Sequence, residues 1–329
     1  MVKSVSIYRY LLKRLLMPKK VSLRFAVLHF AFSLVFASAM SLLSFSSYAG
    51  DDVETTKSDE QQSDAVVWAF SAGSNSEEAT YSIPREELQS HTIDVLGRPL
   101  HFIEAYKDRD KGPKPLIVFV HGTPGGWGDQ IGFITNEFMR KHFHMIAVDR
   151  LGHGRSTGKI ESSLQAQAVS LKPLLDRDTT GEGAILVGHS LGGPIIARTA
   201  MDFPEHVSGL VFVASSGDPK RSRRWYNTVG GIPPICWLLP KQLARSNREI
   251  LPLKKELKAM LPLWQTIKVP TTIMQGGKDT LVKPANANFI QNALVNAKVK
   301  MVIQPQSDHF LHWREPQALV DVLAEFIAL

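Results

Sequence analysis

Ser190 is the strongest candidate for a catalytic residue, because it lies on an expected turn between a strand and a helix. Residues 181–193 read GEGAILVGHSLGG, and the apolar run Ala184–Val187 has the length and composition of a buried strand. Ser190 follows that run inside the pentapeptide GHSLG at 188–192, and a small-residue helix is expected next. The pattern predicts a nucleophile elbow, a tight turn that holds the serine hydroxyl clear of the backbone. Glycines flank the serine because a side chain at either place would crowd the turn.

A serine hydroxyl becomes a good nucleophile only when a base can take its proton and an acid orients that base. His309 follows the last predicted strand and a short loop, which places it at the sheet edge beside Ser190. His312 lies one helical turn further on and is expected to be structural. Asp279, after the seventh predicted strand, and Asp218, after the sixth, are both sterically suitable acids, so position alone leaves the choice open.

The third predicted strand ends in HGTPGG at 121–126, a glycine-rich turn that can present backbone amides. The Thr123 and Leu191 amides are expected to form an oxyanion hole there. His121 and His189 are expected to pack as structural residues within their turns. The segment VDRLGHGRS at 148–156 predicts a further tight, structural loop. The sequence has no HExxH motif and no GKS or GKT ending, so neither a metal nor a cofactor is expected.

Short apolar runs alternate with helix-length segments from about residue 83 onward, which predicts an α/β fold with an eight-stranded, mostly parallel sheet and helices on both faces. The predicted strands are His91–Val95, Leu100–Ala105, Leu116–Val120, Met145–Val148, Ala184–Val187, Gly209–Val213, Thr271–Met274 and Val299–Ile303. The predicted helices are Gln130–Lys141, Ser162–Leu175, Leu191–Met201, Pro284–Asn296 and Pro316–Ala328. The first two strands are expected to form an antiparallel hairpin.

The segment 219–265 interrupts this alternation between the sixth and seventh strands and is predicted to be a helical cap. The core is therefore expected to comprise 83–218 and 266–329. Trp225, Trp237 and Trp264 lie in the cap and are expected to line a substrate pocket over the elbow. The alternative is that such apolar residues anchor the cap to the sheet. The cap also holds ten lysines and arginines against two glutamates, and these basic residues are expected on its solvated face.

Charge is distributed unevenly along the 329 residues, which carry a formal net charge of +7. Residues 1–49 contain seven lysines and arginines and no acid, and the remainder is balanced at 31 basic against 31 acidic residues. The basicity therefore belongs to a targeting segment, which argues against nucleic-acid binding. The polar, acidic stretch 50–82 is interpreted as a flexible linker.

Residues 1–49 have the pattern of an export signal: a basic start, an apolar run and small residues at Ser47 and Ala49. The protein is accordingly expected to be periplasmic or secreted. The alternative is an uncleaved membrane anchor that contacts the membrane through 25–45. The start codon could be Met1 or Met17. With Cys236 as the sole cysteine, the chain can form no internal disulfide.

Five motifs in order give the chain, over about Ile83 to Leu329, a close resemblance to the α/β-hydrolase fold superfamily. They are HGTPGG at 121–126, VDRLGHGRS at 148–156, GHSLGG at 188–193, GGKD at 276–279 and DHFLHWREP at 308–316. The chain departs from the family's usual pattern in having Asp308 before the histidine, where glycine is common. It also has Arg314 where an acid often stands.

The resemblance implies that Ser190 is the nucleophile, Asp279 the acid and His309 the base, with the Thr123 and Leu191 amides as the oxyanion hole. Serine at the elbow argues against dehalogenases and epoxide hydrolases, which carry aspartate there. Carboxylic-ester hydrolysis is the first expectation because it needs only the triad and the hole. Thioesterases, carbon-carbon bond hydrolases, iminopeptidases and perhydrolases are alternatives, and a noncatalytic binding module on the same fold is another.

Overall fold

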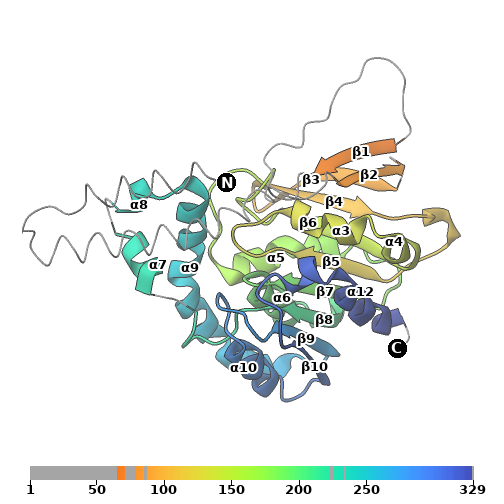
Figure 1. The fold of residues 1–329 in the computed structure, drawn as a ribbon. Helices are drawn as coiled ribbons and strands as arrows, with labels where there is room; N and C mark the ends of the chain where they lie inside the picture. Colours follow the sequence, from red (N-terminus) through yellow and green to blue (C-terminus); the bar gives the residue numbers. More distant parts are fainter. Residues whose placement is uncertain (1–64, 71–78, 85–86, 223–224, 233–234, 328–329) are drawn as a thin grey trace, which may run out of the picture. The chain divides into compact units, whose positions relative to one another are not determined.

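An eight-stranded sheet forms the centre of the computed structural model, which describes residues 65–70, 79–84 and 87–327 except 223–224 and 233–234. The strands lie in the order β10-β9-β8-β7-β5-β6-β4-β3 (Figure 1). Their bounds are β3 Leu88–Val95, β4 Arg98–Ala105, β5 Leu116–Val120, β6 His144–Val148, β7 Ala184–His189, β8 Val207–Val213, β9 Thr271–Gly276 and β10 Val299–Gln304.

Strands β5 to β10 pair in parallel, whereas β4 is antiparallel to both of its neighbours, β3 and β6. Burial explains the composition of the strands. Every residue of β5 and β6 is buried, as their mainly apolar runs LIVFV and HMIAV predict, whereas the edge strand β3 alternates buried or half-buried with exposed residues. The expected α/β fold and the expected lead-in hairpin are therefore confirmed.

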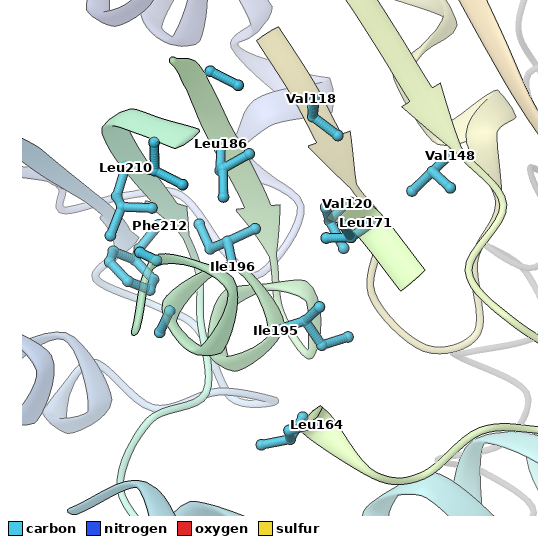
Figure 2. Packing of buried hydrophobic residues seen from close by; sticks show 14 of the residues in the cluster. Val118, Val120, Val148, Leu164, Leu171, Leu186, Ile195, Ile196, Leu210 and Phe212 are labelled. Carbon is cyan, nitrogen blue, oxygen red and sulfur yellow. The ribbon is translucent and has the colours of Figure 1, made fainter. Parts of the chain in front are cut away.

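Helices cover both faces of the sheet because successive strand residues point to opposite sides. On β5, Val118 and Val120 belong to one apolar cluster, and Ile117 and Phe119 belong to the other. The first face packs against α5 (Leu164–Leu175), α6 (Gly192–Asp202) and α10 (Ala285–Ala293). Figure 2 shows side chains of α6 directed toward those of β5, β7 and β8.

The second face packs against α3 (Ile131–Ile134), α4 (Glu137–His142), α11 (Leu311–Arg314) and α12 (Pro316–Ala324). The sequence predicts a single helix over Gln130–Lys141, and the structure divides it at Thr135 and Asn136. The Asn136 side chain accepts a hydrogen bond from the Met139 N–H at 3.0 Å, which starts α4 as a separate capped helix.

The segment between β8 and β9 is helical, as the expected fold requires. It contains α7 (Trp225–Gly230), α8 (Ile235–Leu238), α9 (Lys241–Met260) and the 3₁₀ segment Leu261–Thr266. The C-terminal half of α9 inserts Leu253, Leu257 and Met260 into the first apolar cluster. This segment, 219–265, is called the cap from here on, and its base is continuous with the core.

Two further strands lie before the sheet. β1 (Ala65–Phe70) pairs antiparallel with β2 (Ala79–Pro84), with Ala65 opposite Pro84. The polar, acidic composition of 50–82 predicts a flexible linker; these two strands lie largely within its second half, where β1 is a continuous apolar run and β2 alternates apolar with polar residues. The predicted export signal, 1–49, and residues 50–64 lie outside the described residues. Among the described residues, no helix combines the length and the apolar character needed to cross a membrane.

Candidate active site

Ser190 lies on the turn between β7 and α6 with a φ angle of 54°, in the left-handed region that non-glycine residues rarely adopt. Its N–H donates to the Val213 carbonyl at 2.9 Å, which holds the strained residue against β8. The flanking glycines have a steric cause. A β-carbon on Gly192 would lie 2.1 Å from the Val120 carbonyl oxygen, and one on Gly188 would lie 2.7 Å from the Gly192 carbonyl carbon. The chain can therefore make this turn only with glycine at both positions.

His309 and Asp279 meet at the carboxyl edge of the sheet, with 2.8 Å between His309 Nδ1 and Asp279 Oδ2. Both residues are buried. A carboxylate at Nδ1 selects the tautomer that carries its proton there, which leaves Nε2 with a lone pair. His309 can thus accept a proton at Nε2.

Asp279 is held on all sides by hydrogen-bond donors. Its Oδ1 accepts from the N–H groups of Leu281 and Val282, both at 2.8 Å, and its Oδ2 also accepts from Gln275 Nε2 at 3.2 Å. Gln275 is fully buried on β9, and sequence reasoning did not identify it. Its only sequence signal is a polar residue inside an apolar strand.

Asp218, the rival acid, lies in different surroundings. Its Oδ2 is 3.1 Å from Arg221 Nε, and its Oδ1 accepts from the Lys220 N–H at 2.8 Å. The structure therefore brings Asp279 to His309 and gives Asp218 a local partner in the first turn of the cap.

His189 links the elbow to the histidine loop. Its Nε2 donates to the His309 carbonyl at 3.2 Å, and the two rings lie 4.7 Å apart between centroids. Burial, followed by the neighbouring His312 and His309, lowers the pKa of His189 well below its usual value. Since His189 precedes Ser190 in the chain, this contact holds the His309 loop beside the serine.

The His312 ring contacts the His189 ring at an interplanar angle of 43°, with 4.2 Å between ring centroids. Burial lowers its pKa to about 3, so the ring is neutral at physiological pH. Its ring also stacks on the ring of Phe133, as expected for a residue with a structural role.

The glycine-rich loop after β5 lies directly against the elbow. A β-carbon on Gly122 would be 3.0 Å from Ser190 Cβ. Within the described part of the chain, no hydrogen-bond acceptor is paired with the N–H of Thr123 or of Leu191. The arrangement can present two backbone donors beside the serine, which is the requirement for stabilising an oxyanion.

His121 stiffens this loop. Its Nε2 accepts from the Arg150 N–H at 3.1 Å, so its Nδ1 carries the proton and donates to the Gly122 carbonyl at 2.8 Å. Burial, reinforced by the charge of Arg150, lowers the pKa of His121 well below its usual value. Asp149 ties the same region to β4 by accepting from His101 Nδ1 at 2.7 Å.

The two residues that depart from the family pattern around His309 pair with each other. Asp308 and Arg314 form an ion pair with 2.9 Å between Oδ2 and Nη2. Glu315, one residue further on, accepts from Gln304 Nε2 at 2.7 Å and from the Ser307 hydroxyl. The loop that carries His309 is therefore closed by its own side chains.

The cap tryptophans do not share one environment. Trp264 is 2% exposed and packs in the core between Phe212 and Phe289, with ring centroids at 6.2 and 6.1 Å. This corrects the expectation that Trp264 lines a substrate pocket, because its ring anchors the base of the cap to β8 and α10. Trp237 is 76% exposed. The side chain of Trp225 lies outside the described residues.

Comparisons with known proteins identify similar sequences and folds. Residues 115–235 match the model of the alpha/beta hydrolase fold family. The rat protein named mitochondrial palmitoyl-protein thioesterase ABHD10 is 28% identical over 67% of this chain and 77% of its own length. Its human counterpart is 25% identical over 67% of this chain and 75% of its own length.

Solved structures show the same fold. The esterase EaEST from Exiguobacterium antarcticum aligns with a TM-score of 0.58 at 17% identity, over 73% of this chain and 100% of that one. Est816, described as an N-acyl homoserine lactone degrading enzyme, aligns with a TM-score of 0.54 at 20% identity, over 72% of this chain and 100% of that one. The chain is a hydrolase of the α/β-hydrolase superfamily.

Proposed function

We propose that this protein hydrolyses carboxylic esters through a covalent acyl-enzyme on Ser190. The observation that carries the proposal is the 2.8 Å pair between His309 and Asp279, held beside the strained elbow by His189. Nucleophile, base and orienting acid are the three parts that acyl transfer on serine requires.

In the first half-reaction, His309 Nε2 takes the proton of the Ser190 hydroxyl as Oγ attacks the ester carbonyl carbon. The carbonyl oxygen becomes an oxyanion, which accepts hydrogen bonds from the N–H groups of Thr123 and Leu191. Asp279 stabilises the imidazolium. His309 then gives its proton to the departing alkoxide, and an alcohol leaves.

The second half-reaction repeats these steps with water. His309 removes a proton from water, which attacks the acyl carbon and forms a second oxyanion in the same hole. Collapse of this intermediate breaks the bond to Oγ, and the proton on His309 returns to Ser190. The carboxylic acid leaves, and no cofactor takes part in either step.

Thioesters are the second candidate substrates. The relatives named palmitoyl-protein thioesterases favour them, and the same hole and triad serve a thiolate leaving group. A panel of oxygen esters and thioesters with identical acyl chains distinguishes the two. The ester proposal predicts the higher kcat/KM on oxygen esters at every chain length.

Substitution Ser190→Ala tests the covalent route. The variant should keep the fold and lose more than about a thousandfold in kcat on an activated ester. Retention of most activity by the purified variant would overturn the proposal. If a fluorophosphonate does not label the wild type and no ester is hydrolysed, the protein is better explained as a noncatalytic binding module.

We also propose that the protein is exported and that the mature chain begins near Gly50. The support is the basic start, the apolar run and the small residues before Gly50 in the sequence. Mass spectrometry of the mature protein should find that N-terminus. An intact N-terminus recovered from a membrane fraction would favour the anchor instead.

A further inference from the structure

A buried ion pair joins the cap to the loop after β6. The Arg150 guanidinium donates from Nη1 to Glu249 Oε1 at 2.6 Å and from Nη2 to Glu249 Oε2 at 3.2 Å. The side chains are 0% and 2% exposed, respectively. Glu249 lies on α9 in the cap, so this pair crosses the boundary between cap and core.

The same guanidinium also holds the backbone of the glycine-rich loop. Arg150 Nη2 donates to the Gly122 carbonyl at 2.6 Å, and Nε donates to the His121 carbonyl at 3.0 Å. The Gly122 carbonyl and the Thr123 N–H belong to one planar peptide group. Whatever fixes the carbonyl oxygen therefore fixes the direction of the N–H on the opposite side of that plane.

Charge adds to this geometric effect. A donor that carries a positive charge polarises the peptide whose carbonyl it binds, and the N–H of that peptide becomes a stronger donor. Glu249 keeps the guanidinium aligned and balances its charge. His153 is a second partner of Glu249, since its Nε2 lies 3.1 Å from Glu249 Oε2. Although burial alone would raise the pKa of Glu249, Arg150 and His153 hold it well below its usual value.

A contribution to folding stability does not explain why Arg150 and Glu249 are paired in the interior. Desolvation of two buried charges consumes most of the Coulombic gain, and apolar residues of similar volume often serve as well or better. Arg150 binds two carbonyls of the glycine-rich loop and a carboxylate of the cap at the same time, and apolar residues could not make these directed hydrogen bonds. It sets the loop in one orientation relative to α9.

We propose that Arg150 and Glu249 are positioning residues that orient and polarise the Thr123 N–H for the oxyanion, so that the hole is fully assembled only when α9 is docked. The inference rests on the proposed function, because it assigns to Thr123 the role of an oxyanion donor. It makes the cap part of the catalytic apparatus.

The chain offers a matched control on the same helix. Glu256, two turns after Glu249, also ties α9 to the core, since its Oε2 accepts from the Leu164 N–H at 3.0 Å at the start of α5. That contact belongs to α5 and does not involve the glycine-rich loop. Glu249→Gln and Glu256→Gln thus each weaken one cap contact, but only the former reaches the Gly122 carbonyl.

The experiment compares both variants with the wild type in hydrolysis of an activated ester, with rates expressed per active site titrated by a fluorophosphonate. A boronic acid that forms a tetrahedral adduct on serine reports on the hole independently of turnover. For Glu249→Gln we expect kcat to fall about tenfold or more with KM within about twofold, and the boronate to bind more weakly by the factor lost in kcat/KM. Glu256→Gln should stay within about twofold of the wild type in all three quantities.

Glu249→Asp, which keeps the charge and shortens the side chain, should recover part of the lost kcat. It also serves as the test variant if Glu249→Gln yields too few titratable sites. Equal kcat and boronate affinity in the Glu249 and Glu256 variants, or a change in KM alone, would overturn the inference. These results leave the proposed function standing as long as the wild type is labelled on Ser190, whereas failure of that labelling removes both.

Discussion

Substitution Asp279→Asn tests how the acid controls the histidine. The carboxylate accepts two backbone N–H groups at Oδ1, and it accepts Gln275 Nε2 and His309 Nδ1 at Oδ2. An asparagine keeps the two backbone bonds only if its oxygen takes the place of Oδ1. Its NH₂ group then faces the histidine ring, so Nδ1 must become an acceptor and the ring proton moves to Nε2.

That tautomer cannot take the proton of Ser190, because Nε2 is already occupied. A histidine locked in the wrong tautomer costs about 10⁴-fold in kcat in the Ser-His-Asp template, which corresponds to about 5 kcal/mol in activation free energy at about 1.4 kcal/mol per factor of ten. The NH₂ group would also face the Gln275 Nε2 donor, so the hydrogen bond between these side chains is lost and the free energy of unfolding should fall by about 1–3 kcal/mol.

The assay is hydrolysis of an activated ester by Asp279→Asn beside the matched variant Asp218→Asn, with circular dichroism to confirm folding. Asp218 pairs with Arg221, so its variant should retain kcat within about threefold of the wild type. An Asp279 variant within tenfold of the wild type, or an inactive Asp218 variant, would refute the assignment of the acid.

Three further outcomes are expected. Trp264→Ala should lower the free energy of unfolding in urea by about 3–5 kcal/mol, whereas Trp237→Ala should change it by about 0.5 kcal/mol or less; equal costs would contradict the anchoring role of Trp264. Burial raises the pKa of Asp129 to about 7 from 3.8. Wild-type stability should therefore fall relative to Asp129→Asn as pH rises from about 4 to about 7, and parallel thermal midpoints across that window would contradict this. Gly192→Ala should yield little folded protein, because its β-carbon would meet the Val120 carbonyl; a normal melting curve would refute the steric argument.

The fold was largely predictable from local pattern. Continuous apolar runs mark the buried strands, and each predicted strand overlaps an observed one. The apolar pattern predicted one helix over Gln130–Lys141 where the structure has two. The Asn136 side chain caps the second helix, and a single cap of this kind does not change the apolar periodicity. The same pattern also predicted no strands at β1 and β2, because the acidic composition of 50–82 outweighed one short apolar run and one short alternating segment.

The site was predictable only in part. Ser190 and His309 stand out because their positions follow from strand ends, which sequence shows well. The choice between Asp279 and Asp218 depends on which loop reaches the histidine, and that distance is a tertiary property. Glu249 was invisible for the same reason, since its partner Arg150 is 99 residues away in the chain. A glutamate in a basic, amphipathic helix resembles a solvated residue until the structure shows it buried.

The most direct test of the central claim is to locate the covalent adduct. Wild-type protein treated with a fluorophosphonate should gain the mass of one phosphonyl group, and fragmentation of the peptide that contains residues 181–193 should place it on Ser190. Ser190→Ala should gain no mass under the same conditions. An adduct on another residue, or equal labelling of the Ser190→Ala variant, would contradict the claim that this protein acts through an acyl-enzyme on Ser190.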